Sequence, residues 1–271
     1  MDKLVEHYNK FNEDKRLDRR HGHVEFVTSF KYIEKYLNKY MQEHELRDYD
    51  QLQVLDVGAG TGKYSIKLAQ LGCQVTSVEY VKYNLGRLKQ NATKAQVDIS
   101  AYQGDARKLK KCSDNTYDMT LIFGPMYHLY TDEDKVRALQ EAKRVTKPGG
   151  YILVAYLMNE YSVIVYGFRE GNVNECLKDG RLDSDYHTHS SQEELYEYVR
   201  LEDINRINDM AGVTRQQIIS ADGPADYMRR ELNAMDDETY ERFIEYHLKT
   251  CERPELLGAG AHTLDILQKV L

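Results

Sequence analysis

The stretch VLDVGAGTG, residues 54–62, contains an apolar run followed directly by a glycine-rich turn. Val54, Leu55 and Val57 form a short, partly β-branched run, which is typical of a buried strand. Asp56 interrupts the run close to its end, and a helical pattern follows the three glycines. The stretch therefore predicts the strand, turn and helix that open a nucleotide-binding βαβ unit. Glycine suits such a turn because it accepts dihedrals that a Cβ forbids and lets a ligand lie against the main chain.

The spacing of the glycines separates three kinds of nucleotide site. Dinucleotide enzymes use G-x-G-x-x-G, whereas Gly62 comes one residue too early for that pattern. A phosphate-binding P-loop needs a Ser or Thr after its lysine, but Lys63 is followed by Tyr64, and Gly58 lies one residue too close. The remaining pattern, D-x-G-x-G-x-G from Asp56, resembles motif I of the class I S-adenosylmethionine (SAM)-dependent methyltransferases. On this motif alone, another Rossmann-like nucleotide binder is the alternative.

The chemistry of SAM agrees with this resemblance. SAM has no phosphates, so it needs no wide anion-binding loop. It carries a sulfonium and an ammonium group, and the carboxylate of Asp56 at the strand end suits those positive charges.

Two acidic residues follow at positions where such a fold uses them. Residues 74–79 alternate apolar and polar side chains and predict a second strand, closed by Glu79 where βαβ units place an acid for ribose hydroxyls. A third strand is expected over residues 97–101. The resemblance implies that Asp105 then caps the adenine amino group and that the backbone N–H of Ala106 meets a ring nitrogen. Glutamates at strand ends and Gly-Asp turns also occur at ordinary surfaces, which is the alternative for both.

Two further features extend the resemblance to about 100 residues. Residues 117–123 predict the fourth strand, and GPMYHL follows at 124–129, where the carboxyl ends of parallel strands open into a ligand crevice. This segment resembles the G-P-[LM]-Y-H-L stretch of many small-molecule methyltransferases, and it differs from the [DN]-P-P-[YFW] motif of enzymes that methylate nitrogens in nucleic acids and glutamines. KPGG at 147–150 is expected to form a turn before a strand over 151–156.

The resemblance implies a set of ligand contacts. The cofactor-binding residues would be Asp56, Gly58, Ala59, Gly60, Gly62, Glu79, Tyr80, Asp105, Ala106 and Phe123, with Tyr8 covering SAM from the N-terminal helix. His128 and its neighbour Tyr127 are the candidate catalytic residues, because a neutral imidazole is available near pH 7 to accept a proton. The alternative is that both pack beside the methionine moiety and shape the pocket. The product of the cofactor would be S-adenosylhomocysteine (SAH).

The expected fold class is α/β, with a doubly wound, seven-stranded, mostly parallel sheet whose last strand is antiparallel. The last two strands are expected over residues 213–220 and 262–267. The expected division of the chain is an N-terminal helical lid over residues 1–48, the SAM-binding Rossmann-like core over 49–156, an inserted cap over 157–198 and the C-terminal part of the core with a helical insertion over 199–271.

The lid is expected to contain two helices, the first carrying Leu4, Val5, Tyr8 and Phe11. A charged, glycine-containing break over residues 16–23 would separate them, as a solvated linker or as a mobile segment that reaches the substrate.

Two histidines in the cap raise the question of a metal. His187 and His189 would lie on one side of an extended chain, but the sequence offers no identifiable third ligand. Cap packing or substrate contact is therefore favoured, and no metal is expected. His247 and Cys251 share the apolar face of a helix and are expected to be core residues.

Composition limits the compartment and the partners. With 41 % hydrophobic residues the chain can build a sizeable core, and its formal net charge of −7 argues against a protein bound to nucleic acid or anionic membrane. Four scattered cysteines without a C-x-x-C pair indicate reduced thiols. Without an apolar signal region or a membrane-spanning run, we expect a cytoplasmic monomer or homodimer.

The sequence thus predicts a SAM-dependent methyltransferase that acts on a small molecule. The alternatives are a methyltransferase of tRNA or protein, which would need a basic or extended surface, and a SAM-binding protein without turnover. The sequence does not specify the acceptor atom, the pathway or the oligomeric state.

Overall fold

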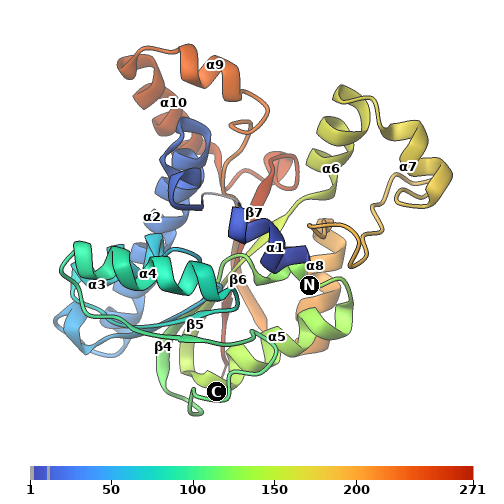
Figure 1. Ribbon diagram of the computed structural model, residues 1–271. Coiled ribbons are helices and arrows are strands. Elements are labelled where there is room, and N and C mark those ends of the chain that lie inside the picture. Colours follow the sequence, from blue (N-terminus) through green and yellow to red (C-terminus); the bar gives the residue numbers. More distant parts are fainter. Residues whose placement is uncertain (1–2, 11–12, 271) are drawn as a thin grey trace.

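The computed structural model describes residues 3–10 and 13–270 and contains one seven-stranded sheet with helices on both faces (Figure 1). The strand order is β3-β2-β1-β4-β5-β7-β6, and β7 is antiparallel to both of its neighbours, whereas the pairs among β1 to β5 are parallel. The predicted fold class is confirmed. The strands are β1 (Gln53–Val57), β2 (Gln74–Glu79), β3 (Ser100–Gln103), β4 (Tyr117–Ile122), β5 (Thr146–Leu157), β6 (Thr214–Ser220) and β7 (His262–Gln268).

The helices form the outer layers and two projecting groups. Figure 1 shows α9 and α10 beside the N-terminal part of α2, and α6 and α7 in an arm beyond the end of β5. The α-helices are α1 (Lys3–Lys10), α2 (Arg20–Glu43), α3 (Lys63–Leu71), α4 (Lys82–Lys94), α5 (Asp132–Val145), α6 (Asn159–Ser162), α7 (Val173–Asp179), α8 (Leu201–Ala211), α9 (Arg229–Ala234) and α10 (Asp237–Thr250). Shorter turns are the 3₁₀ helices η1 (Glu13–Asp18), η2 (Tyr49–Gln51), η3 (Pro125–His128) and η5 (Pro254–Leu256) and the π-helical η4 (Val163–Arg169).

Alternate residues of the central strands fill two separate cores. Leu121 of β4 packs in a cluster with Leu37 of α2 and Leu68 of α3. Its neighbour Ile122 belongs to a second cluster with Leu139 of α5. This alternation follows from the period of two in a strand, and it explains why β4 is buried throughout although it contains Asp118 and Thr120.

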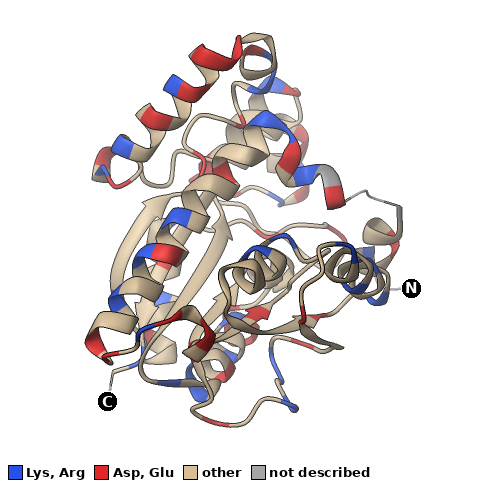
Figure 2. Cartoon of the chain, turned by 90° about the vertical axis from the view of Figure 1, so that its left-hand side faces the viewer, with Lys and Arg blue, Asp and Glu red and all other residues tan. Residues whose placement is uncertain are grey.

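Charged residues lie mainly on the helices and loops. The sheet is almost entirely tan in Figure 2, whereas blue and red residues are mixed along the helices that face the viewer. Within residues 3–10 and 13–270, no helix combines the length and the apolar character that a bilayer crossing requires.

The turn after β1 is fixed by a close approach of two backbone segments. Gly58 has φ +80°, and a Cβ at this position would lie 2.4 Å from Cδ of Pro125 and 2.9 Å from the carbonyl oxygen of Phe123. Any side chain at residue 58 would therefore separate the glycine turn from the segment after β4. The N–H of Gly58 donates to the carbonyl oxygen of Val78 at 2.8 Å, which fixes the turn beside β2.

The predicted position of the third strand was wrong by about three residues. The structure places β3 at Ser100–Gln103, whereas the expectation was a strand over 97–101. Val97 is used otherwise, because its N–H donates to the carbonyl oxygen of Ala92 and closes the C-terminus of α4. The apolar residue that suggested a strand thus belongs to a helix cap.

The predicted break over residues 16–23 was also partly wrong. Helix α2 already begins at Arg20, so Gly22 lies in its first turns rather than in a linker. A Cβ on Gly22 would lie 2.3 Å from the carbonyl oxygen of Arg16, which shows that η1 packs directly against this helix. Glycine is needed here for close packing and not to interrupt the helix. Phe11, expected in the first helix, lies outside the described residues.

The KPGG segment forms an irregularity inside β5 instead of a turn before it. Tyr117 pairs with Thr146, and Met119 pairs with Tyr151, so residues 147–150 bulge out opposite one residue of β4. Gly149 has φ +82°, and Lys147 donates to the buried carboxylate of Asp118 at 2.8 Å.

Buried Asp265 of β7 joins the last two strands to α8. Its carboxylate accepts from Nε of Arg215 on β6 at 2.6 Å and from the amide of Asn208 on α8 at 2.6 Å. Helix α8 ends at Gly212, which has φ +63°, as the sequence predicted. His247 is also confirmed as a core residue, since it is buried, and that burial lowers the pKa of its imidazole to about 4.

Replacing Asp265 with Ala should destabilise the protein strongly. The change leaves Arg215, whose side chain is only 28 % exposed, without its anionic partner, and losing one partner of a buried pair costs about 3 kcal/mol. Urea denaturation followed by circular dichroism measures the free energy of unfolding. Glu245→Ala is the control, because Glu245 pairs with Lys249 on an exposed surface, where an ion pair contributes little to stability. Equal losses for the two variants would contradict this assignment.

Candidate active site

A cavity of about 1080 Å³ opens at the carboxyl ends of β1, β2, β3 and β4. All the residues for which the sequence predicts ligand contact line it, except Gly62. These are Tyr8, Asp56, Gly58, Ala59, Gly60, Glu79, Tyr80, Asp105, Ala106, Phe123, Tyr127 and His128. Gly62 is instead the N-cap residue of α3, with φ +92°.

Glu79 holds the glycine turn in place. Its carboxylate accepts from the backbone N–H of Gly60 at 2.8 Å and from that of Val81 at 2.7 Å. Charge-assisted bonds of this kind are stronger than neutral ones. The side chain at the end of β2 thus bridges two segments of the cavity wall, and Glu79 itself is 95 % buried.

Asp56 is a buried carboxylate with one unused oxygen. Its Oδ2 accepts from the hydroxyl of Ser65 at 2.5 Å, and that hydroxyl lies 2.8 Å from Ser77 Oγ. Its Oδ1 is buried and has no hydrogen-bond partner among the described residues. Burial raises the pKa of Asp56 to about 6. A buried acceptor without a partner is costly, so this oxygen suits a ligand that carries hydrogen-bond donors.

Asp105 is held by an ion pair at the opposite side of the glycine turn. Its carboxylate contacts the guanidinium of Arg107 at 2.7 Å, and Arg107 also donates to Asp134 at 2.7 Å. Burial acts to raise the pKa of Asp105, but the hydrogen bonds from Arg107 outweigh it and lower the pKa. The carboxylate is therefore fixed in its ionised form at the rim of the cavity.

His128 connects three segments of the chain. Its Nδ1 lies 2.8 Å from the carbonyl oxygen of Leu195, which can only accept, so Nδ1 carries a proton. Its Nε2 lies 3.3 Å from the hydroxyl of Tyr8 on α1. In the neutral imidazole Nε2 accepts that hydroxyl proton, and η3 is thereby joined to both α1 and the segment around Leu195. The adjacent Tyr127 is buried, and its carbonyl oxygen accepts from the N–H of Glu197 at 2.7 Å.

A second cluster in the cavity wall was missed by the sequence analysis. Nδ1 of His262 lies 2.7 Å from Oδ2 of Asp222, and Oδ1 of Asp226 accepts from Arg229 at 2.8 Å. Burial alone would lower the pKa of His262, but the surrounding carboxylates raise it to about 9, whereas burial raises the pKa of Asp222 to about 6. The imidazole of His262 is therefore positively charged at neutral pH.

Two residues from the N-terminal segment complete this cluster. Glu25 of α2 is buried and accepts from Arg16 at 2.7 Å, while its other contact is with Nδ1 of His262 at 3.9 Å.

Only the order of the strands could have indicated this cluster beforehand. Asp222 follows β6 and His262 begins the antiparallel β7, so both lie at the same edge of the sheet as the glycine turn.

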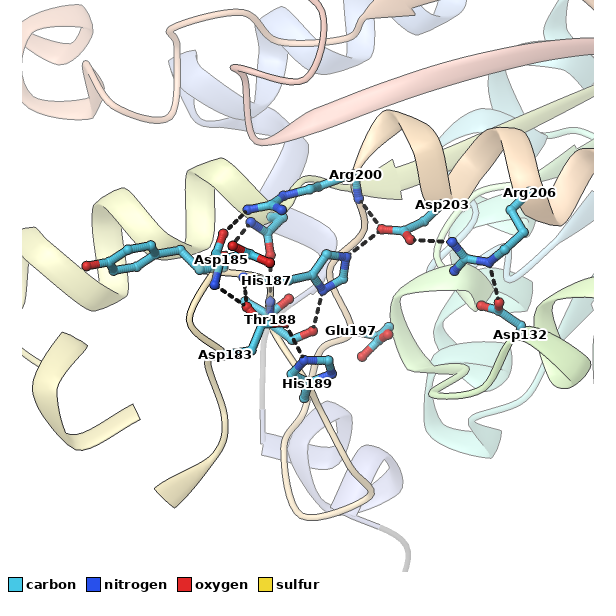
Figure 3. A network of polar contacts seen from close by, with 12 residues as sticks. Asp132, Asp183, Asp185, His187, Thr188, His189, Glu197, Arg200, Asp203 and Arg206 are labelled. Carbon is cyan, nitrogen blue, oxygen red and sulfur yellow. Dashed lines mark hydrogen bonds and ion pairs between the residues drawn. The ribbon is translucent and has the colours of Figure 1, made fainter. Parts of the chain in front are cut away.

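The two cap histidines each pair with a carboxylate (Figure 3). Nε2 of His187 lies 2.7 Å from Asp203 of α8, and its Nδ1 contacts the carbonyl oxygen of Thr188 at 2.9 Å. His189 lies 3.0 Å from the carboxylate of Asp183 within the cap. Both nitrogens of His187 are thus occupied, and Nε2 joins the cap to α8, which agrees with cap packing, one of the two roles that the sequence favoured. From the same part of the chain, Tyr161, Tyr166, Tyr196 and Tyr198 line the cavity.

The glycine turn lies in a part of the chain that is similar to known proteins. Residues 54–150 match a family model described as "Methyltransferase domain". We call residues 54–150 the methyltransferase domain, after the model that they match. The matched range contains the whole of β1 to β4, except for Gln53, and the segment GPMYHL. The glycine turn, Glu79, Asp105 and His128 therefore all belong to this domain, whereas α1, the cap and β7 lie outside it.

Curated relatives are similar to the chain mainly around the methyltransferase domain. The chain is 29 % identical over 125 residues to the glycine/sarcosine N-methyltransferase of Aphanothece halophytica, covering 46 % of this chain and 47 % of that protein. It is 39 % identical over 104 residues to the demethylmenaquinone methyltransferase of Renibacterium salmoninarum, covering 38 % and 40 %. The matched parts thus span less than half the length of these relatives.

Solved structures share the fold over a larger part of the chain. A SAM-dependent methyltransferase from Methanosarcina mazei has a TM-score of 0.55 at 16 % identity, covering 84 % of this chain and 96 % of that one. A putative sarcosine dimethylglycine methyltransferase from Galdieria sulphuraria has a TM-score of 0.54 at 17 % identity, covering 89 % and 86 %. At these identities the likeness concerns the fold of the methyltransferase domain and its surroundings.

Replacing Glu79 with Ala should weaken the binding of SAH. The change removes a charged acceptor predicted to face two ribose hydroxyls and also releases the N–H of Gly60, at a cost of roughly 1.5–3 kcal/mol. That cost corresponds to ~10- to 150-fold in affinity, measured by isothermal titration calorimetry. Glu202→Ala, on the exposed side of α8, is the matched control. An unchanged SAH affinity would remove Glu79 from the binding site.

Proposed function

We propose that this chain is a SAM-dependent methyltransferase that transfers a methyl group to a small-molecule acceptor. The observation that carries the proposal is the convergence of the glycine turn, Glu79 and the unused oxygen of Asp56 on one cavity of the methyltransferase domain. The turn leaves its backbone open to a ligand at Gly60. The carboxylate of Asp56 suits the ammonium group of SAM, and that of Glu79 suits its ribose hydroxyls.

The size of the cavity supports two ligands. Small-molecule sites commonly enclose ~300–1,000 Å³, and the cavity of about 1080 Å³ lies above that range. We infer that SAM occupies the part next to the glycine turn and Asp105. The acceptor then enters between the cap tyrosines, Tyr127 and the cluster around His262.

The reaction is an in-line displacement at the methyl group. SAM, when bound, supplies the reactive sulfonium, and the chain supplies alignment and exclusion of water. Residues 1–48 and 157–198 both contribute to the cavity wall, so we infer that they act as lid and cap. Tyr8 reaches the wall from α1, and Tyr196 reaches it from the end of the cap.

For His128 we favour a positioning role over that of a general base. A general base needs an unprotonated nitrogen within reach of the acceptor. The unprotonated Nε2 of His128 already accepts the hydroxyl of Tyr8, and its Nδ1 faces Leu195. The side chain therefore holds the pocket walls together, with Tyr127 packed beside it.

The proposal of a small acceptor rests on the enclosed cavity and on the net charge of −7, which does not favour nucleic acid. The glycine/sarcosine and demethylmenaquinone methyltransferases among the relatives also carry small molecules in their names. All four cysteines are buried free thiols, which supports a reducing compartment such as the cytoplasm.

Two measurements test the proposed function. Isothermal titration with SAM and SAH should show binding of both. Incubation with SAM and separate metabolite, tRNA and protein pools should then give a product heavier by roughly 14 Da in the metabolite pool, and SAM with an isotope-labelled methyl group should place the label in that product. The Glu79→Ala variant serves as the control with impaired cofactor binding. Label in the tRNA or protein pool would support those acceptors instead. Binding without product would indicate a SAM-binding protein, and failure to bind SAM or SAH would overturn the proposal.

Replacing His128 with Ala should lower turnover and SAH affinity by similar factors. The substitution breaks the contacts of α1 and of the segment around Leu195, and both line the binding cavity through their neighbours. Steady-state rates and titration calorimetry give the two factors. Tyr8→Phe removes only the hydroxyl contact and should reproduce part of the loss. A large fall in turnover with unchanged SAH affinity would instead identify His128 as the base.

A further inference from the structure

Three buried side chains bring metal-ligating atoms together in the cavity wall. Asp222, Asp226 and His262 each offer one nitrogen or oxygen ligand atom, and these atoms all lie within 4.8 Å of one another. All three residues line the cavity. They come from two separate segments, the loop after β6 and the first residue of β7, so the sheet topology and not local sequence assembles them.

The spacing and the chemistry of these atoms suit a transition-metal ion. Bonds from Zn²⁺ to nitrogen and oxygen are about 2.0–2.2 Å long, so two ligand atoms of a tetrahedral ion are about 3.3–3.6 Å apart. The three ligand atoms lie within 4.8 Å of one another, and Nδ1 of His262 lies 2.7 Å from Oδ2 of Asp222, so the side chains shift when an ion enters between them. Imidazole suits Zn²⁺ and related ions, and carboxylates suit Mn²⁺ as well.

The fixed charges on and around the three residues sum to one net negative charge when His262 is not counted. Three buried carboxylates lie here, because Glu25 adjoins Asp222 and Asp226 through His262. Two guanidinium groups pair with them, Arg16 with Glu25 and Arg229 with Asp226. A buried carboxylate that lacks a positive partner is unfavourable, so this set of fixed charges favours a cation among the three side chains.

A second histidine faces the same group of residues. Nε2 of His21 lies 3.9 Å from Oδ1 of Asp226, too far for a hydrogen bond. Its Nδ1 is buried and has no hydrogen-bond partner among the described residues. His21 also lines the cavity from the first turn of α2. The side chain of His21 is only 13 % exposed, and its nitrogens lack a complete set of partners. It therefore provides a further nitrogen atom that can bind a metal beside the three residues.

The other histidine–aspartate contacts of the protein lack this arrangement. His187 with Asp203 and His189 with Asp183 are isolated pairs in the cap. Within residues 3–10 and 13–270, Asp222, Asp226 and His262 are the one group in which three such side chains offer ligand atoms at metal distance.

We propose that Asp222, Asp226 and His262 bind one divalent transition-metal ion, Zn²⁺ or Mn²⁺, in the wall of the cavity. The ion faces the part of the cavity that the cap tyrosines line, so an oxygen or nitrogen of a cavity ligand can complete its coordination. This site stands on its own donor set and does not depend on methyl transfer.

Metal content tests the proposal directly. The full-length protein is treated with a chelator, dialysed against Zn²⁺ or Mn²⁺ at micromolar concentration, and analysed by inductively coupled plasma mass spectrometry. We expect about one ion per chain for at least one of the two metals. Asp222→Asn and His262→Gln should weaken the binding by at least about tenfold. Asp183→Asn removes the carboxylate of an exposed His–Asp pair in the cap and should leave the metal content unchanged.

The outcome does not depend on the folding of the variants. If Asp222→Asn or His262→Gln fails to fold, the wild-type stoichiometry still decides, and a rise in the melting temperature of the wild type on metal addition gives a second readout. Wild-type protein that binds neither metal at 100 µM would overturn the proposal. Metal that is retained equally by the wild type and by folded Asp222→Asn and His262→Gln variants would also overturn it.

Discussion

The candidate site depends on how closely two turns approach each other at the carboxyl ends of β1 and β4. Because residue 58 has no side chain, the glycine turn lies directly against Phe123 and Pro125. Glu79 then fixes the other side of the turn through the N–H of Gly60. These contacts leave the backbone of the turn exposed to the cavity. The same geometry directs the residues after β4, including Tyr127 and His128, toward the lid and the cap.

The antiparallel β7 has a further effect on this edge of the sheet. A strand of that orientation begins where its parallel neighbours end, so His262 lies at the ligand edge. The chain after β6 supplies Asp222 and Asp226 at the same place. The C-terminal part of the fold therefore contributes charged groups to a cavity whose other side is formed by the methyltransferase domain.

The sequence predicted the parts of the fold that local signals determine. The glycine turn, β2 and the end of α8 at Gly212 each carry their own signature within a few residues. The errors arose where a residue makes a contact that its sequence pattern does not show. Val97 closes α4 instead of starting β3, and Gly22 accommodates η1 instead of breaking a helix. The cluster around His262 was missed because it forms only when β7 pairs between β5 and β6. The roles of the predicted site residues stay predictions, although all but Gly62 line one cavity.

The imidazole of His128 has a kinetic consequence. One ring contacts α1 through Tyr8 and the end of the cap through Leu195. These two segments border the cavity from different directions, so displacement of either one disturbs an atom that restrains the other. If SAM and an acceptor enter as proposed, a movement that admits one of them therefore also loosens the wall beside the other.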